Sequence, residues 1–245
     1  MTQRACSSDV RRIDFGYFVR PASESPSGAP QVEPVYGYVV RHPEVTIFFD
    51  SGIGLVDDET ELHYRPQRRP LELALRDENV AVDDITVLVN SHLHFDHCGG
   101  NSRFGDRPIL VQSEELQLAQ EPNYTVAELV DFPRARYESL DGETEIADGV
   151  VVLPTPGHSQ GHQSLLVRAH DGTVFVAGQA MDFSFSGFSV AMSGGASAFA
   201  SVALARRVSL ERGVKLPRWP AWFDRVLQFD PARVVFAHDG AIFTP

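Results

Sequence analysis

The sequence is organised around one stretch, Ser91-His92-Leu93-His94-Phe95-Asp96-His97-Cys98-Gly99-Gly100-Asn101. It places three imidazoles and a carboxylate within six residues, directly after the apolar run Ile85-Thr86-Val87-Leu88-Val89. Two histidines one residue apart project to the same side of an extended segment. Imidazole nitrogens and carboxylate oxygens suit Zn²⁺, Fe or Mn. The stretch therefore predicts a metal-binding loop at the end of a buried strand, in a metal-dependent hydrolase.

The composition is that of an ordinary globular protein, with 245 residues, 43% hydrophobic and 22% charged. We expect a single domain over residues 1–245. The N-terminus has no apolar signal core, and no apolar run approaches the ~20 residues that span a bilayer, so we expect a cytoplasmic protein. The net charge of −12 argues against nucleic acid or an anionic membrane as partner.

Turn-rich and β-branched segments predict the order of the elements. Segment 21–34 is rich in Pro, Ser, Ala and Gly, and segment 183–195 is rich in Phe, Ser and Gly. The first predicts an active-site cover or a disordered connection, and the second predicts a substrate-facing loop or a flexible tether. The runs predict strands at 10–20, 35–40, 45–49, 85–89, 109–111, 150–153, 164–167, 173–177 and 234–236, and helices at 70–78, from an N-cap at Ser113, at 197–212 and at 220–229.

Other ligand-type residues lie at the ends of predicted strands. Asp50 follows Phe48-Phe49, where a carboxylate can orient neighbouring histidines. His158 follows Thr155-Pro156-Gly157, and His238 follows the last predicted strand. Cys98 is either a ligand or a small buried thiol behind the site, and we favour the thiol.

The other notable basic and histidine residues are expected to have solvated or structural roles. The cluster from Arg65 to Arg69 predicts the start of a solvated helix. His42, His63 and His170 are expected at the solvated surface. His162 is expected to be either an outer residue of the metal site or a structural residue behind the His158 loop.

These motifs, in this order, resemble those of the metallo-β-lactamase-fold superfamily, whose signature is His-x-His-x-Asp-His. The phrases Phe48 to Gly52 and Thr155 to Leu165 look most like the N-acyl-homoserine lactonase and pyridoxolactonase branch. The resemblance implies an α+β four-layer αββα sandwich with two mixed β-sheets flanked by helices. It also implies one metal held by His92, His94 and His158, and a second held by Asp96, His97 and His238.

The sequence departs from the family at two sites. Where the family has an Asp that bridges two metals, this chain has Gln179. Because an amide is neutral and a poor bridge, we expect weaker occupancy of at least one metal site. Where lactonases of this type have a Tyr, this chain has Asp182. Asp182 is expected to supply the missing carboxylate, to carry a proton, or to be a surface residue.

The resemblance implies hydrolysis of a lactone or ester bond by metal-activated water, as in quorum quenching, on a small molecule with an apolar portion. Zinc is the expected cofactor, as one or two ions, with Fe or Mn as alternatives. Asp96 and Asp182 are the candidate catalytic residues, and a homodimer is one option for assembly. The alternatives are a thioesterase or another hydrolase on this fold, or a metal-binding protein whose active site has decayed.

Overall fold

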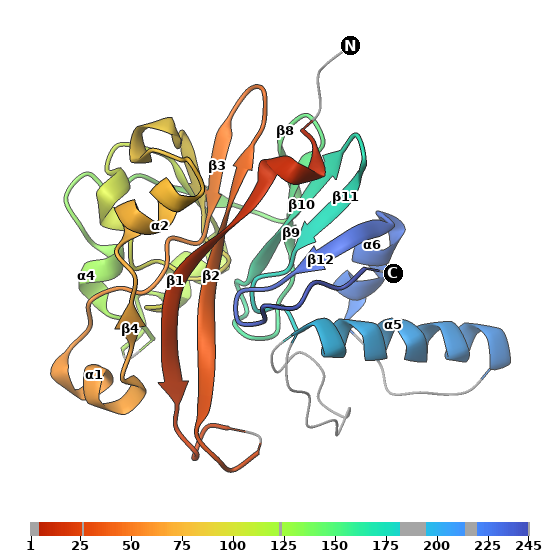
Figure 1. The fold of residues 1–245 in the computed structure, drawn as a ribbon, viewed down its shortest axis with the longest axis horizontal. Helices are drawn as coiled ribbons and strands as arrows, with labels where there is room; N and C mark the ends of the chain where they lie inside the picture. Colours follow the sequence, from red (N-terminus) through yellow and green to blue (C-terminus); the bar gives the residue numbers. More distant parts are fainter. Residues whose placement is uncertain (1–4, 26, 123, 182–194, 214–219, 245) are drawn as a thin grey trace.

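The computed structural model describes residues 5–25, 27–122, 124–181, 195–213 and 220–244. Two mixed β-sheets pack face to face, with helices on both outer sides (Figure 1). The first sheet has the strand order β4-β1-β2-β3-β5-β6-β7, and the second has β12-β11-β10-β9-β8. The expected αββα sandwich is confirmed.

The first sheet changes from antiparallel to parallel pairing at its centre. β1, β2 and β3 pair antiparallel, whereas β3, β5, β6 and β7 run parallel. Its strands are β1 (Val10–Arg20), β2 (Gln31–Arg41), β3 (Thr46–Phe49), β4 (Gln67–Arg68), β5 (Val87–Val89), β6 (Ile109–Gln112) and β7 (Tyr137–Leu140).

In the second sheet, two of the predicted strands form a hairpin, in which β10 and β11 pair antiparallel up to Ala169 and Gly172. The last strand adds parallel to β11, which makes this sheet mixed as well. Its strands are β8 (Thr144–Ala147), β9 (Val150–Pro154), β10 (Gln163–Ala169), β11 (Gly172–Val176) and β12 (Pro231–Val235).

The helices divide between the two outer layers. Figure 1 shows α2 and α4 beside the first sheet, and α5 and α6 beside the second. No helix in the described ranges is long and apolar enough to cross a membrane. The helices are α1 (Asp58–Tyr64), α2 (Leu71–Asp77), α3 (Ser113–Leu118), α4 (Ala127–Val130), α5 (Gly195–Arg212) and α6 (Ala221–Gln228).

Side-chain alternation along the strands explains the layers. In β3, Phe49 belongs to the core cluster between the sheets, which also contains Val152 and Val176 of the second sheet. Its neighbour Phe48 belongs to the cluster on the outer side, with Leu75 of α2. Successive residues of a strand point to opposite faces, so a strand buried on both faces needs apolar residues throughout. Each such side chain contributes about 1.5–3 kcal/mol when fully buried. The apolar runs of the sequence are therefore the central strands of a four-layer structure.

Several local predictions were wrong for identifiable reasons. β2 begins at Gln31, inside the segment expected to be a loop, because it pairs with β1 as far as Arg20. The basic cluster forms β4 instead of a helix start, and Arg68 donates to the carbonyl of Gly54 and to Glu61. Ser113 is the first residue of α3, and its N-cap is Gln112.

One histidine expected at the surface is also buried. His42 is 6% exposed in the β2–β3 turn, where its Nδ1 accepts the Glu44 amide proton and its Nε2 lies 3.2 Å from the carbonyl of Asp148. His63 and His170 are exposed as predicted, although the side chain of His63 bonds Glu24. The residues around His42 are typical of an exposed turn, and they did not indicate that the β2–β3 turn packs against the second sheet.

Candidate metal centre

Asp50 bonds the loop that contains the candidate ligands and fixes the orientation of His97. It follows β3 with a left-handed φ of +58°, and its side chain is 1% exposed. Its Oδ1 accepts the amide proton of Ser91 at 2.7 Å, and its Oδ2 accepts the Ser91 hydroxyl and His97 Nδ1, both at 2.8 Å. Because Nδ1 of His97 is used in this bond, Nε2 is left facing the centre.

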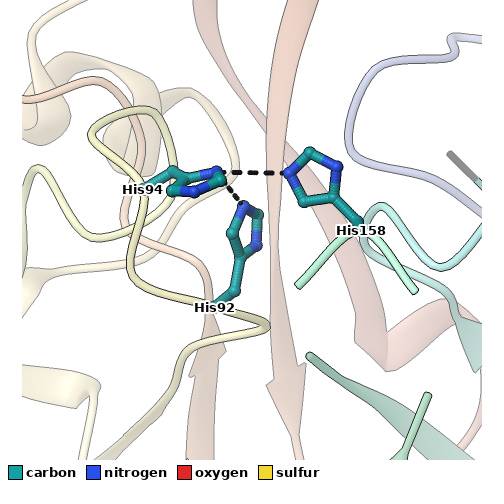
Figure 2. A group of neighbouring side chains, drawn as sticks. All are labelled: His92, His94 and His158. Carbon is teal, nitrogen blue, oxygen red and sulfur yellow. Dashed lines mark hydrogen bonds between the residues drawn. The ribbon is translucent and has the colours of Figure 1, made fainter. Parts of the chain in front are cut away.

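Three ring nitrogens converge from two loops (Figure 2). His92 Nε2 lies 3.0 Å from His94 Nδ1, and His158 Nε2 lies 3.2 Å from the same atom. The opposite nitrogen of His92, Nδ1, lies 3.0 Å from the Ser91 hydroxyl, which orients the ring. A tetrahedral zinc ion with Zn–N bonds of about 2.0–2.1 Å places its ligands about 3.3 Å apart. The spacing of these nitrogens fits one such ion.

A second group forms around Asp96. Its Oδ2 lies 3.3 Å from both His97 Nε2 and His238 Nε2. His238 donates its other ring proton to the carbonyl of Pro34 at 2.7 Å, which turns Nε2 towards Asp96. Both Nε2 atoms are buried and make no well-oriented hydrogen bond within the described chain. Two buried nitrogens without a well-oriented partner, both facing one carboxylate, form a set of donors that a divalent ion would satisfy.

The two groups differ in charge. Burial, together with the neighbouring histidines, lowers the pKa of His92 and His158 well below its usual value. Burial likewise lowers the pKa of His94 to about 4. All three rings are therefore neutral at pH 7 and can offer lone pairs. The first group is a neutral set of three nitrogens.

In the second group, carboxylates outweigh burial. Burial lowers the pKa of His97, but Asp96 and Asp50 together raise it to about 10. The pKa of His238 is raised by Asp96 in the same way, against the effect of burial. Burial raises the pKa of Asp96, yet the facing His97 and His238 hold it well below its usual range. The group is thus built around negative charge that needs a cation, either a proton or a metal ion.

A pocket of about 830 Å³ opens onto both groups. Its floor includes His94, Asp96, His158 and Gln179. Its walls are partly aromatic and its rim is acidic. The remaining described residues that line it are Phe18, Arg20, Asp57, Glu59, Thr60, His63, Tyr64, Phe95, Tyr124, Thr125, Val126, Ala127 and Glu128.

Gln179 lies at the pocket floor, just after β11, and is 4% exposed. Its backbone N–H donates to His162 Nε2 at 3.1 Å. His162 Nδ1 in turn lies 2.8 Å from Thr155 Oγ1. His162 therefore connects the turn that contains Gln179 to the start of the loop that contains His158. Asp182, the other departure from the family pattern, lies outside the described residues, as does most of segment 183–195.

Three residues that the sequence did not single out are central to the site. Ser91 links Asp50 to two histidines. Glu115 lies in the first turn of the helix that was predicted from Ser113, and its side chain is fully buried. Tyr124 packs against His94, with ring centroids 4.7 Å apart. Spacing gave no signal for Glu115 or Tyr124. Cys98 is a fully buried thiol, and its Sγ lies 3.5 Å from the carbonyl of Leu93.

Comparison with known proteins places this geometry in a family. A model described as the metallo-beta-lactamase superfamily matches residues 30–238. An N-acyl homoserine lactonase of Bacillus cereus is 32% identical over 147 residues, which cover 55% of this chain and 58% of the relative. An N-acyl homoserine lactonase of Bacillus thuringiensis subsp. kurstaki is 44% identical over 86 residues, which cover 35% of this chain and 34% of the relative.

The matched stretches therefore span less than two thirds of these relatives. Among solved structures, a quorum-quenching N-acyl homoserine lactone hydrolase is similar in fold, with a TM-score of 0.67 and 25% identity. That match covers 98% of this chain and 94% of the other. The family model spans most of the chain, including both groups of candidate ligands and the strands that carry them. The chain belongs to the metallo-beta-lactamase superfamily.

Proposed function

We propose that this protein is a metal-dependent hydrolase that opens the ring of an uncharged lactone with an apolar portion. One observation carries the proposal: two groups of ligand-type side chains meet at the floor of a pocket large enough for a small molecule. The names of the similar Bacillus proteins support the choice of a lactone.

The first ion would be held by His92, His94 and His158, and the second by Asp96, His97 and His238. Zinc is the cofactor that we propose first, because nitrogen-rich sets of three protein ligands suit a zinc ion with an open coordination site. Iron and manganese are the alternatives. A divalent cation in this site supplies Lewis-acid polarisation of a carbonyl and makes water more acidic.

The chain's own residues would orient the substrate and accept the proton. When the second site holds no ion, Asp96, ionised and at the pocket floor, can take up at its carboxylate the proton that the attacking water loses. Phe95 and Tyr64 stack on each other, with ring centroids 5.3 Å apart, and form an apolar wall. Such a wall favours an apolar substrate portion and excludes water around the ester. A role for Asp182 in protonating the leaving alkoxide stays a prediction.

The charge of the pocket rim supports an uncharged substrate. Asp57, Glu59 and Glu128 line the rim. Arg20 also lines the pocket, but it pairs with Glu33 through two hydrogen bonds of 2.5 and 2.8 Å. A thioester on an anionic carrier would meet net repulsion at this rim, so the rim favours a lactone over the thioesterase alternative.

The direct test is a ring-opening assay on protein reconstituted separately with Zn²⁺, Mn²⁺ and Fe²⁺, with the metal content measured on the same samples. We expect proton release from N-acyl homoserine lactones, and little from coenzyme A or glutathione thioesters. An Asp96→Ala variant should be inactive, whereas Glu72→Gln, on the exposed side of α2, should match the wild type. Verified metal loading with no opening of any lactone would refute the proposal.

A second candidate function rests on Gln179. A neutral amide at the floor of the pocket lacks the charge expected between two metal ions, which favours a metal-binding protein with a decayed active site. A Gln179→Asp variant separates the two functions. An inert wild type with an active variant supports decay, whereas an active wild type that this substitution inactivates supports a working site. Cytoplasmic location, homodimer formation and a role in quorum quenching stay predictions.

A further inference from the structure

A buried carboxylate outside the pocket connects the two loops that provide the first group of histidines. Glu115 of α3 is fully buried. Its Oε1 accepts the amide proton of Leu93 at 2.8 Å and also the hydroxyl proton of Tyr124. Its Oε2 accepts the hydroxyl proton of Ser159 at 2.7 Å. Three donors from three separate segments therefore meet on one side chain.

Each donor is adjacent to a candidate ligand. Leu93 lies between His92 and His94 in the sequence, so its amide belongs to the peptide that spaces these two rings. Ser159 directly follows His158. Tyr124 packs on the ring of His94. Because the His92–His94 loop follows the first sheet and the His158 loop joins two strands of the second, Glu115 bonds across the sandwich at the site.

Close backbone packing provides a second observation at the same contact. A Cβ on Gly161 would lie 2.3 Å from the backbone nitrogen of Glu115 and 2.5 Å from its Cα. Real Cβ atoms do not approach backbone this closely, and a rigid packed interior does not relax freely. The loop of His158 therefore rests directly on α3, and only a glycine allows this approach.

We propose that Glu115 is a positioning residue that sets the distance between His94 and His158 and so determines the metal affinity of the first group. Glu115 is not among the described residues that line the pocket, so it acts through Leu93 and Ser159. The inference extends the proposed function, because the ion that it positions is the one that hydrolysis would use. Residues that orient metal ligands commonly change affinity 10–100-fold when they are removed.

The test uses the full-length protein, with metal affinity measured by chelator competition and ligand geometry by the absorption spectrum of the cobalt-substituted form. Glu115→Ala removes the three bonds, and Gly161→Ala displaces the loop from the opposite side. We expect each substitution to weaken binding of the first ion about 10–100-fold and to shift the cobalt spectrum. Glu115→Gln, which keeps the shape and part of the bonding, should recover most of the affinity.

Val226→Ala is the matched control, because Val226 is a fully buried residue of α6 in the core on the far side of the second sheet. It should lower the melting temperature of the protein and leave affinity and spectrum unchanged. If Glu115→Ala also lowers the melting temperature but changes neither the metal affinity nor the cobalt spectrum, Glu115 has only a structural role and the proposal is wrong.

Single-donor variants keep the test decisive if Glu115→Ala does not fold. Ser159→Ala and Tyr124→Phe each remove one bond, and at least one should shift the cobalt spectrum; if neither does, the proposal is overturned. None of these readouts requires catalysis. If the variants shift the cobalt spectrum but the wild type opens no lactone, the proposed function is rejected and the positioning role is kept. If the wild type opens lactones but no variant shifts the spectrum, the positioning role is rejected and the proposed function is kept.

Discussion

Asp50→Asn should move the ring proton of His97 from Nδ1 to Nε2 without altering the shape of the site. Asp50 now accepts three hydrogen bonds, one of them from His97 Nδ1. An Asn oxygen can still accept the Ser91 amide proton, but its NH₂ group then faces the imidazole. The ring must offer Nδ1 as acceptor, which moves its proton to Nε2, the atom that lies 3.3 Å from Asp96.

The expected magnitude follows from the loss of one ligand nitrogen and one negative charge. Replacing the residue that orients a metal-bound histidine typically lowers metal affinity 10–100-fold. This range equals about 1.4–2.8 kcal/mol of binding free energy. The effect should be largest in the second group, because Asp50 bonds the ring of His97 directly. Within the described chain it reaches His92 of the first group only through the Ser91 hydroxyl.

The assay is metal titration of metal-free protein against a competing chelator, with the two binding steps fitted separately. We expect the step assigned to Asp96, His97 and His238 to weaken and the other to change little. Glu145→Gln is the control, because Glu145 accepts one backbone amide, that of Gly149, away from the pocket. If Asp50→Asn binds both ions as the wild type does, the reasoning on the His97 proton is refuted.

Further predictions concern acid stability, the core and the rim. Burial lowers the pKa of His162 from 6.5 to about 3. The unfolded chain therefore takes up a proton below pH 6.5 that the folded protein excludes, so the free energy of unfolding falls as pH drops from 6.5 towards 3. In urea titrations of metal-free protein, His162→Gln should reduce this slope by about 1.4 kcal/mol per pH unit, and equal slopes would contradict it. Phe223→Ala should lower the free energy of unfolding by about 3–5 kcal/mol with unchanged metal content per folded molecule, and a loss below ~1 kcal/mol would show that α6 is loosely packed. Glu59→Gln combined with Glu128→Gln should lower KM for an anionic ester about two- to fivefold at low salt but not for a neutral lactone, and parallel changes for both substrates would exclude a charge effect.

The sequence predicted best where local chemistry and tertiary environment agree. The apolar strands β3, β5, β9 and β11 are buried on both faces, so their composition alone indicated them. β7 and β8 were missed because their residues are polar and only partly buried. β7 is a strand because it pairs with β6, and no local pattern records that partner.

The same distinction applies to the site. The histidines and Asp96 were predicted from short spacing and a family resemblance, and the structure brings them into two groups. Glu115 could not be predicted, because an acidic residue in the first turn of a helix is usually solvated. Its burial depends on Ser159 and Leu93, which approach it only after the two sheets pack together.

The origin of the ligands in both sheets has a consequence for folding. His158 and His238 follow β9 and β12 of the second sheet, whereas Asp96 and its neighbours follow β5 of the first. Neither group can assemble in a chain whose sheets have not docked, so an isolated His-x-His-x-Asp-His loop offers an incomplete set of donors. Metal binding would then be coupled to the last stage of folding. Available metal would shift the population from partly assembled chains to the docked state and slow its loss to proteolysis.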